Sequence, residues 1–301
     1  MLSALKTLSN KTIKYALWAA HPVVAPWLPR LSILSSIETL ERVSDKKTSL
    51  ARFGDGELRQ ALLGVNQSIQ RPNEELDARL RDILKREQEH LLVCLPGLLE
   101  RPNEATAAPR RLWKAHRIVL NPLLSRVVGE GREFGEALVT RPFLVFQDLD
   151  KAHETFVKWK ELFRGRDLVV IEGDLTRLGI GSDLFDGAAS IRRILCPATN
   201  AFNAYAQIIA AALEAPRKSL FILALGKTAT VLAADLAAKG RQALDVGNLD
   251  VEYYWYKNRC KRQVAVPGKF TYEAEGGASV GPCLDQAYHA SVSKRLYETQ
   301  E

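Results

Sequence analysis

Ser219-Leu-Phe-Ile-Leu-Ala-Leu-Gly-Lys-Thr-Ala-Thr230 is the stretch that decides the fold. Its apolar run has the length of a strand, and Gly226 ends it. The residues after Gly226 indicate a helix that runs to Lys239 and ends at Gly240. A strand that is apolar throughout and passes directly into a helix is typical of a parallel sheet with both faces buried.

The rest of the second half repeats this alternation of strand and helix. Residues 167–171, 190–196 and 243–246 read as further strands, and residues 197–213 contain a helix. We therefore expect an α/β fold, with a Rossmann-like, mostly parallel sheet and helices on both faces. Sheets of this kind bind ligands at the carboxyl ends of their strands.

Two loops at these strand ends carry residues suited to phosphate. In the turn at 226–230, backbone N–H groups and the helix dipole can hold a phosphate, with Lys227 and Thr228 as further donors. Tight packing of strand on helix, with a capping threonine, explains the same pattern equally well. In an earlier loop Thr176 and Arg177 lie among glycines and could grip a pyrophosphate. The alternative there is an exposed arginine without a partner.

The stretch Ser49-Leu-Ala-Arg-Phe-Gly-Asp-Gly-Glu-Leu58 suggests a metal site. Its first residues read as a strand, and Gly56 would let a tight turn aim Asp55 and Glu57 at one point. Mg²⁺ and Mn²⁺ prefer such oxygen ligands and share them with substrate phosphates. A plain Asp-Gly turn with a solvated glutamate is the simpler interpretation of this motif alone.

A second Asp-x-Glu pair lies in Leu249-Asp-Val-Glu-Tyr-Tyr-Trp-Tyr256. If this segment is extended, Asp250 and Glu252 share one face. Because an extended chain spaces their Cα atoms about 6.6 Å apart, we expect two separate tasks instead of one chelate. Glu252 is then the candidate base that deprotonates an acceptor hydroxyl, with Asp250 next. A structural salt bridge explains these carboxylates equally well.

Composition excludes some classes of function. The chain of 301 residues has a net charge of +7, which suits an anionic substrate or an acidic membrane surface. It lacks the dense Lys/Arg runs of a nucleic-acid binder. The widely spaced Cys94, Cys196, Cys260 and Cys283 indicate free thiols in a reducing compartment, so we expect a cytoplasmic protein.

The first 36 residues form a distinct segment without acidic side chains. Lys14, His21, Pro22 and Pro26 interrupt its apolar run, which is too broken to span a membrane or to serve as a signal peptide. We expect a helical lead-in packed on the domain. A basic, Trp-bearing helix lying on the inner face of the membrane is the open alternative.

Several blocks of the chain, in order, resemble one bacterial family. They are Arg52-Phe-Gly-Asp-Gly-Glu57, Glu172-Gly-Asp-Leu-Thr-Arg-Leu-Gly179, Leu184-Phe-Asp186, Arg193-Ile-Leu-Cys-Pro-Ala-Thr-Asn-Ala-Phe202, Leu225-Gly-Lys-Thr-Ala-Thr230, Asp245-Val-Gly-Asn-Leu-Asp-Val-Glu-Tyr253 and Gly268-Lys-Phe-Thr-Tyr-Glu273. The family is the glycosyltransferases of the GT-D fold. The resemblance implies three segments: a lead-in at 1–36, a glycosyltransferase domain at 37–275 and a C-terminal tail at 276–301.

The resemblance also implies an activity. Such an enzyme moves a hexose from a nucleotide-sugar, typically a UDP-sugar, to a glycan on a protein or lipid carrier, with Mn²⁺ or Mg²⁺ at Asp55 and Glu57. The matching blocks imply nucleotide contacts from Arg52, Phe53, Glu172, Thr176, Arg177, Asn200, Gly226, Lys227 and Thr228. Two other classes remain: a non-catalytic nucleotide-binding module, which would not need the Asp-x-Glu pair, and a metal-dependent phosphohydrolase, which usually has more clustered Asp or His ligands.

Overall fold

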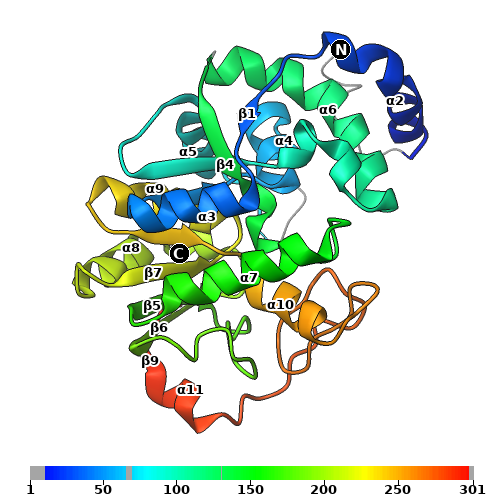
Figure 1. Cartoon of the computed structure of the whole chain (residues 1–301). Helices are drawn as coiled ribbons and strands as arrows, with labels where there is room; N and C mark the ends of the chain where they lie inside the picture. Colours follow the sequence, from blue (N-terminus) through cyan, green and yellow to red (C-terminus); the bar gives the residue numbers. More distant parts are fainter. Residues whose placement is uncertain (1–10, 66–69, 130, 298–301) are drawn as a thin grey trace.

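The computed structural model describes residues 11–65, 70–129 and 131–297. Within these ranges nine parallel strands form one sheet in the order β1-β4-β3-β2-β8-β7-β5-β6-β9 (Figure 1). The strands are β1 (Ser32–Ile33), β2 (Ser49–Arg52), β3 (Leu91–Leu95), β4 (Glu133–Glu136), β5 (Asp167–Gly173), β6 (Ser190–Cys196), β7 (Leu220–Ala224), β8 (Ala243–Asp245) and β9 (Val292–Arg295). The expected parallel α/β sheet is confirmed.

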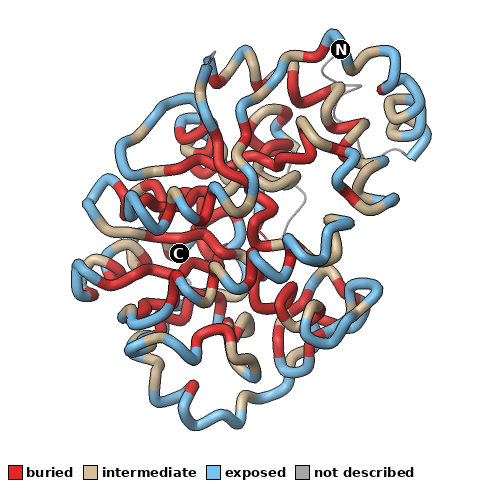
Figure 2. The backbone as a smooth tube through the Cα atoms, in the orientation of Figure 1, coloured by how far each residue is buried: buried red, intermediate tan, exposed pale blue. Residues whose placement is uncertain are grey.

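Helices cover both faces of this sheet. They are α2 (Lys11–Val24), α3 (Ser36–Asp45), α4 (Asp55–Leu63), α5 (Glu74–Lys85), α6 (Ala107–Val128), α7 (Leu149–Phe163), α8 (Tyr205–Glu214), α9 (Lys227–Ala238), α10 (Leu249–Lys257) and α11 (Gln286–Ser291), with 3-10 turns η1 (Ala25–Trp27), η2 (Gly97–Leu99), η3 (Pro102–Glu104), η4 (Ala137–Thr140) and η5 (Ala201–Ala204). One apolar core includes residues of α4, α5, α6, α8 and α9, and a second includes residues of α3, α7 and α10. The buried chain between these layers is red in Figure 2.

Strand β7 shows why the central strands are apolar at every position. Phe221 and Leu223 belong to the first core, whereas Leu220 and Ile222 belong to the second, and all four are 0% exposed. Successive strand residues point to opposite faces. A strand covered on both faces therefore cannot alternate between apolar and polar residues.

The strand order joins the two halves of the chain at the middle of the sheet. β2 and β8 are neighbours, with Leu50 opposite Leu244. The order in which strands are added also reverses at β5: β6 lies on one side of β5, and the next strand, β7, lies on the other. In open α/β sheets the ligand crevice lies beyond the carboxyl ends of the strands at such a reversal.

The structure corrects two expectations and limits a third. Residues 249–256, which we expected to be extended, form most of helix α10. The supposed tail at 276–301 contains α11 and β9, and β9 adds to the edge of the sheet beside β6. Within the expected lead-in, α2 and η1 are helical, whereas residues 1–10 lie outside the described part of the chain.

Candidate functional site

A cavity of about 650 Å³ opens at the carboxyl ends of the central strands. Its lining includes the ends of β2, β5, β7 and β8, the first turns of α4 and α6, and the segment 270–273. Seven residues expected at the site line it: Arg52, Asp55, Glu57, Thr176, Asn200, Gly226 and Lys227. The cavity thus lies at the carboxyl ends of the strands, where we expected the site.

Asp55 and Glu57 enter this cavity from the first turn of α4. The Asp-Gly-Glu stretch is thus a helix start, and Gly56 does not close the loop that we expected. Glu57 reaches back so that its Oε2 accepts a hydrogen bond from the Gly54 N–H at 3.0 Å. Burial raises the pKa of Glu57, and the nearby Asp245 carboxylate acts in the same direction.

Asp55 has two close neighbours that the sequence did not predict. Its Oδ1 lies 3.2 Å from Nδ1 of His116, and its Oδ2 lies 3.7 Å from Nη1 of Arg59. His116 is fully buried in α6 and meets Trp113 edge to face. Burial lowers the pKa of His116 to about 4, so the ring is neutral near pH 7.

The donor set is suited to a hard divalent cation. Asp55 Oδ1 is shielded from solvent and accepts no hydrogen bond from the described residues. No cluster of three or more His, Cys, Asp or Glu side chains that could hold a metal occurs in the described ranges. A cation bound by Asp55 and Glu57 would therefore need further oxygens from water and a phosphorylated ligand, which is the usual arrangement for Mg²⁺.

The charges of the cavity lining are balanced. Its lining holds four cationic and four anionic side chains: Arg52, Arg59, Arg141 and Lys227, and Asp55, Glu57, Asp245 and Glu273. A diphosphate alone would add uncompensated negative charge to a partly buried site. A divalent cation beside it would restore the balance.

Arg52 is held firmly where β2 meets β8. Its Nη2 bonds Asp245 Oδ1 at 3.0 Å, its Nε donates to the Asp245 carbonyl at 2.7 Å, and its Nη1 donates to Thr140 Oγ1 at 2.7 Å. A Cβ at Gly247, where φ is +50°, would lie 2.3 Å from Arg52 Nη2. Arg52 lines the cavity, but most of its donors already serve the protein.

The turn after β7 passes directly from strand to helix and lines the cavity. Gly226 has φ +54° and ends the strand, and α9 begins at the next residue. Lys227 is buried and donates to Gln60 Oε1, and burial lowers its pKa. Asn200, also at positive φ, accepts a hydrogen bond from the Arg71 N–H at 2.7 Å. Thr228 is buried and lies outside the cavity lining.

The structure does not bring Phe53, Glu172 and Arg177 into the cavity lining. Phe53 is a core residue, and Glu172 pairs with Arg193 at 2.6 Å. Arg177 is 7% exposed and donates to the carbonyls of Gly268 at 2.8 Å and Gly281 at 2.7 Å. The arginine that we expected to grip a pyrophosphate therefore joins loops of the protein.

The second Asp-x-Glu pair is also internal. Asp250 accepts hydrogen bonds from Lys269 Nζ and, at 2.9 Å, from the Gly179 N–H. Glu252 Oε1 accepts from the backbone N–H groups of Phe143 at 3.0 Å and Leu144 at 2.8 Å. Because α10 is helical, the two carboxylates leave on different sides, and neither lines the cavity.

Sequence reasoning missed several residues of the site. Arg59 was detectable, because it follows Asp55 at the i,i+4 spacing of a helical ion pair. His116 gave no signal, since it occurs as a lone histidine in a basic helix. Glu273 is held by Arg141, and by Asn248 at 3.1 Å. These contacts depend on tertiary packing.

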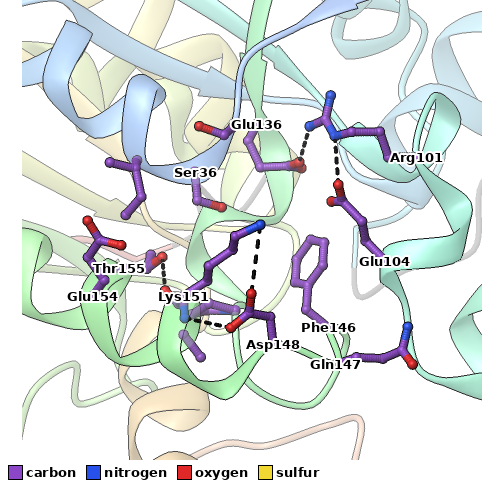
Figure 3. A pocket seen from close by; sticks show the side chains of 14 residues that line it. Ser36, Arg101, Glu104, Glu136, Phe146, Gln147, Asp148, Lys151, Glu154 and Thr155 are labelled. Carbon is purple, nitrogen blue, oxygen red and sulfur yellow. Dashed lines mark hydrogen bonds and ion pairs between the residues drawn. The ribbon is translucent and has the colours of Figure 1, made fainter.

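A second cavity, of about 330 Å³, lies between α3, α7 and the end of β4. Figure 3 shows its charged groups: Arg101 between Glu104 and Glu136, and Lys151 beside Asp148. Burial raises the pKa of Glu136 to about 7. The segment 136–147 separates the two cavities, because it contributes lining residues to both.

The solved structures that match the chain define its class as the α/β glycosyltransferase fold. One is described as "The highly conserved domain of unknown function 1792 has a distinct glycosyltransferase fold", with a TM-score of 0.82 and 31% identity over 94% of this chain and 98% of that chain. Another, "A New Glycosyltransferase (DUF1792) from Streptococcus sanguinis", also has a TM-score of 0.82, with 32% identity over 89% of this chain and 100% of that chain.

The family model "Glycosyltransferase GT-D fold" matches residues 50–274, and the chain belongs to this family. Among curated relatives, "Probable glycosyl transferase Gly" of Streptococcus gordonii is 33% identical over 89% of this chain and 39% of its own length. "Glycosyltransferase GlyD" of Streptococcus pneumoniae serotype 4 (strain ATCC BAA-334 / TIGR4) is 34% identical over 86% of this chain and 32% of its own length. The chain thus spans well under half the length of these relatives.

Proposed function

We propose that this chain transfers a hexose from a nucleotide-sugar, with UDP as the expected nucleotide, to a glycan on a protein or lipid carrier. The observation that carries the proposal is the convergence of the α4 carboxylates and the Gly226 turn on one cavity. The carboxylates suit a divalent metal, and the turn suits phosphate. A nucleoside diphosphate with its cation needs both.

In this proposal Asp55 and Glu57 hold Mn²⁺ or Mg²⁺. When bound, the metal offsets the negative charge that develops on the departing nucleoside diphosphate. The start of α9 would donate backbone N–H groups to the same phosphates. Arg59 and Lys227 add positive charge at the cavity wall, and Asn200 and Thr176 are polar groups within the same lining.

The carboxylate best placed to receive the acceptor proton is Glu273. It lines the same cavity as Asp55 and Glu57 but comes from a distant part of the sequence. Arg141 and Asn248 donate hydrogen bonds that fix its orientation. A general base must come within hydrogen-bond reach of the hydroxyl that it deprotonates. Glu252, our candidate from the sequence, instead binds two backbone N–H groups outside the cavity lining.

A donor screen tests the proposal. The chain is incubated with UDP- and GDP-sugars, Mn²⁺ and a panel of lipid-linked and peptide-linked glycans, and products are identified by mass spectrometry. We expect one donor to elongate one acceptor, and we expect excess chelator to stop the reaction. Phosphate release without an acceptor requirement would indicate a phosphohydrolase, and nucleotide binding without any product would indicate a non-catalytic module.

A further inference from the structure

The outward side of α2 and η1 carries a line of apolar residues. Tyr15, Val23 and Trp27 are 66%, 76% and 86% exposed, and the exposed Ala19 lies between them. These positions are four residues apart, so in α2 they follow one side of the helix, and Trp27 continues the line in η1. Contiguous apolar surface of this kind marks an interaction site on a protein.

The inward side of α2 is apolar as well, because it packs on α6 at the edge of the molecule (Figure 1). Leu17 packs against the main core, and His21 is buried. A helix that is apolar on both sides is normally covered on both sides. In the described part of the chain, the outward side of α2 stays on the surface, as Figure 2 shows.

The charged side chains of α2, η1 and α6 are all basic, and the neighbouring Glu100 pairs with Arg117 of α6 at 3.4 Å. Neither the chain between Lys11 and Ile37 nor helix α6 contains an acidic residue. The cations of the two segments are Lys11, Lys14, Arg30, Arg110, Arg111, Lys114, Arg117 and Arg126. Aromatic side chains flanked by lysine and arginine suit the headgroup region of an anionic bilayer. A second copy of the same cationic surface would be repelled.

Helix α2 adjoins the cavity wall through α6, on which its inward side packs. Ala108, Pro109, Leu112 and Trp113, in the first turns of α6, line the cavity. Lys114 and Arg117, in the next turns, lie close enough to His21 of α2 to lower its pKa, after the larger effect of burial. A bilayer that contacts α2 would therefore lie near the cavity wall.

We propose that the α2 surface, meaning Tyr15, Ala19, Val23 and Trp27 with Lys11, Arg30 and Arg111, binds an anionic membrane interface and presents the cavity to acceptors on lipid carriers. The residues sit in the interface without crossing it; within the described ranges, no helix has the length and apolarity that a membrane span requires. The proposed membrane contact does not depend on the proposed glycosyl transfer. The proposed acceptor class does depend on it.

Vesicle sedimentation tests the membrane contact without donor, metal or acceptor. The full chain is mixed with phosphatidylcholine vesicles that contain phosphatidylglycerol, or with phosphatidylcholine alone, at low and high salt. We expect stronger binding to the anionic vesicles and a decline with salt. Tyr15→Ser/Val23→Ser/Trp27→Ser should reduce binding by about tenfold or more, and Lys11→Gln/Arg30→Gln/Arg111→Gln should remove the preference for phosphatidylglycerol.

Leu284→Ser/Tyr297→Ser is the matched control, because these residues are 86% and 70% exposed but lie near the C-terminus. It should bind vesicles like the wild type. Wild-type protein that ignores anionic vesicles, or a triple serine variant that binds them normally, would overturn the proposal. So would a dimer, detected by light scattering, that the triple variant abolishes, because a second copy would then cover the surface.

The acceptor class has its own readout. With an active donor in hand, vesicle-embedded lipid-linked glycans should be elongated faster than water-soluble analogues, and the triple serine variant should lose only this advantage. Equal rates on both acceptors would contradict the proposed preference for acceptors on lipid carriers. They would not contradict the proposed membrane contact. Absence of transfer to any acceptor would count against the proposed function, whatever the vesicles show.

Discussion

The Nδ1 atom of His116 lies 3.2 Å from the Oδ1 atom of Asp55. The histidine is fully buried, so its polar Nδ1 atom is held beside this carboxylate, although the two atoms make no hydrogen bond. Groups that orient a metal ligand typically change metal affinity when they are removed. His116 is thus a positioning residue for the proposed cation site.

We expect His116→Phe, which keeps a ring but removes both nitrogens, to weaken Mn²⁺ binding by about 10–100-fold. Electron paramagnetic resonance of free Mn²⁺ gives the affinity without substrate turnover. His153→Phe is the control, because His153 is exposed and contacts Tyr256, outside the cavity. Unchanged Mn²⁺ affinity in His116→Phe would show that the contact does not position Asp55.

Asp55→Asn should abolish transfer, because an amide is a much poorer ligand for a divalent cation than a carboxylate. The thermal midpoint should hardly change, since Asp55 is 36% exposed and its ion pair with Arg59 is long. Activity and calorimetric Mn²⁺ titration are measured on the same preparation. Full activity of this variant, or of the wild type in excess chelator, would refute the metal site.

Arg177→Ala should lower the free energy of unfolding by about 1.5–3 kcal/mol, because the guanidinium makes charged hydrogen bonds to two carbonyls. UDP affinity should stay the same, since Arg177 does not line the cavity. Chemical denaturation and calorimetry give the two quantities. A large loss of UDP affinity in a stably folded variant would restore the phosphate role that the sequence suggested.

The two candidate bases should behave differently. Glu273→Gln should lower kcat by about 10²-fold or more while sparing Mn²⁺ and UDP binding. Glu252→Gln should mainly affect stability, because the Glu252 carboxylate accepts two backbone hydrogen bonds. Single-turnover rates and thermal midpoints distinguish the two residues. If Glu273→Gln turned over normally and Glu252→Gln lost most of its turnover at equal stability, the general base would be Glu252 of α10.

Glu136 should make the protein less stable as the pH rises from about 4.5 to about 7. Burial raises its folded pKa from 4.5 to about 7, so the folded state retains a proton that the unfolded chain has lost. Glu136→Gln should remove a penalty on the order of 2–3 kcal/mol above this window and change little below it. Urea unfolding across the pH range measures the difference, and parallel wild-type and variant curves would contradict it.

The fold class could be read from the sequence because it depends on local patterns. Continuous apolar runs such as 220–225 are long enough only for strands and must be buried on both faces. The N-cap of α5 is equally local, because Asn73 Oδ1 accepts a hydrogen bond from the Leu76 N–H at 2.9 Å. The position of the cavity could also be predicted, because strand direction fixes which loops meet at one edge of the sheet.

The identity of the site residues needed tertiary structure. Asp55-Gly-Glu57 and Asp250-Val-Glu252 are the same motif in sequence, and both begin helices. α4 starts at the cavity, whereas α10 directs its carboxylates to Lys269 and to backbone N–H groups of distant loops. Burial and partners are set by segments far away in the chain, so no local pattern could tell the two pairs apart. For the same reason only the packing of α6 against α4 could place His116 beside Asp55.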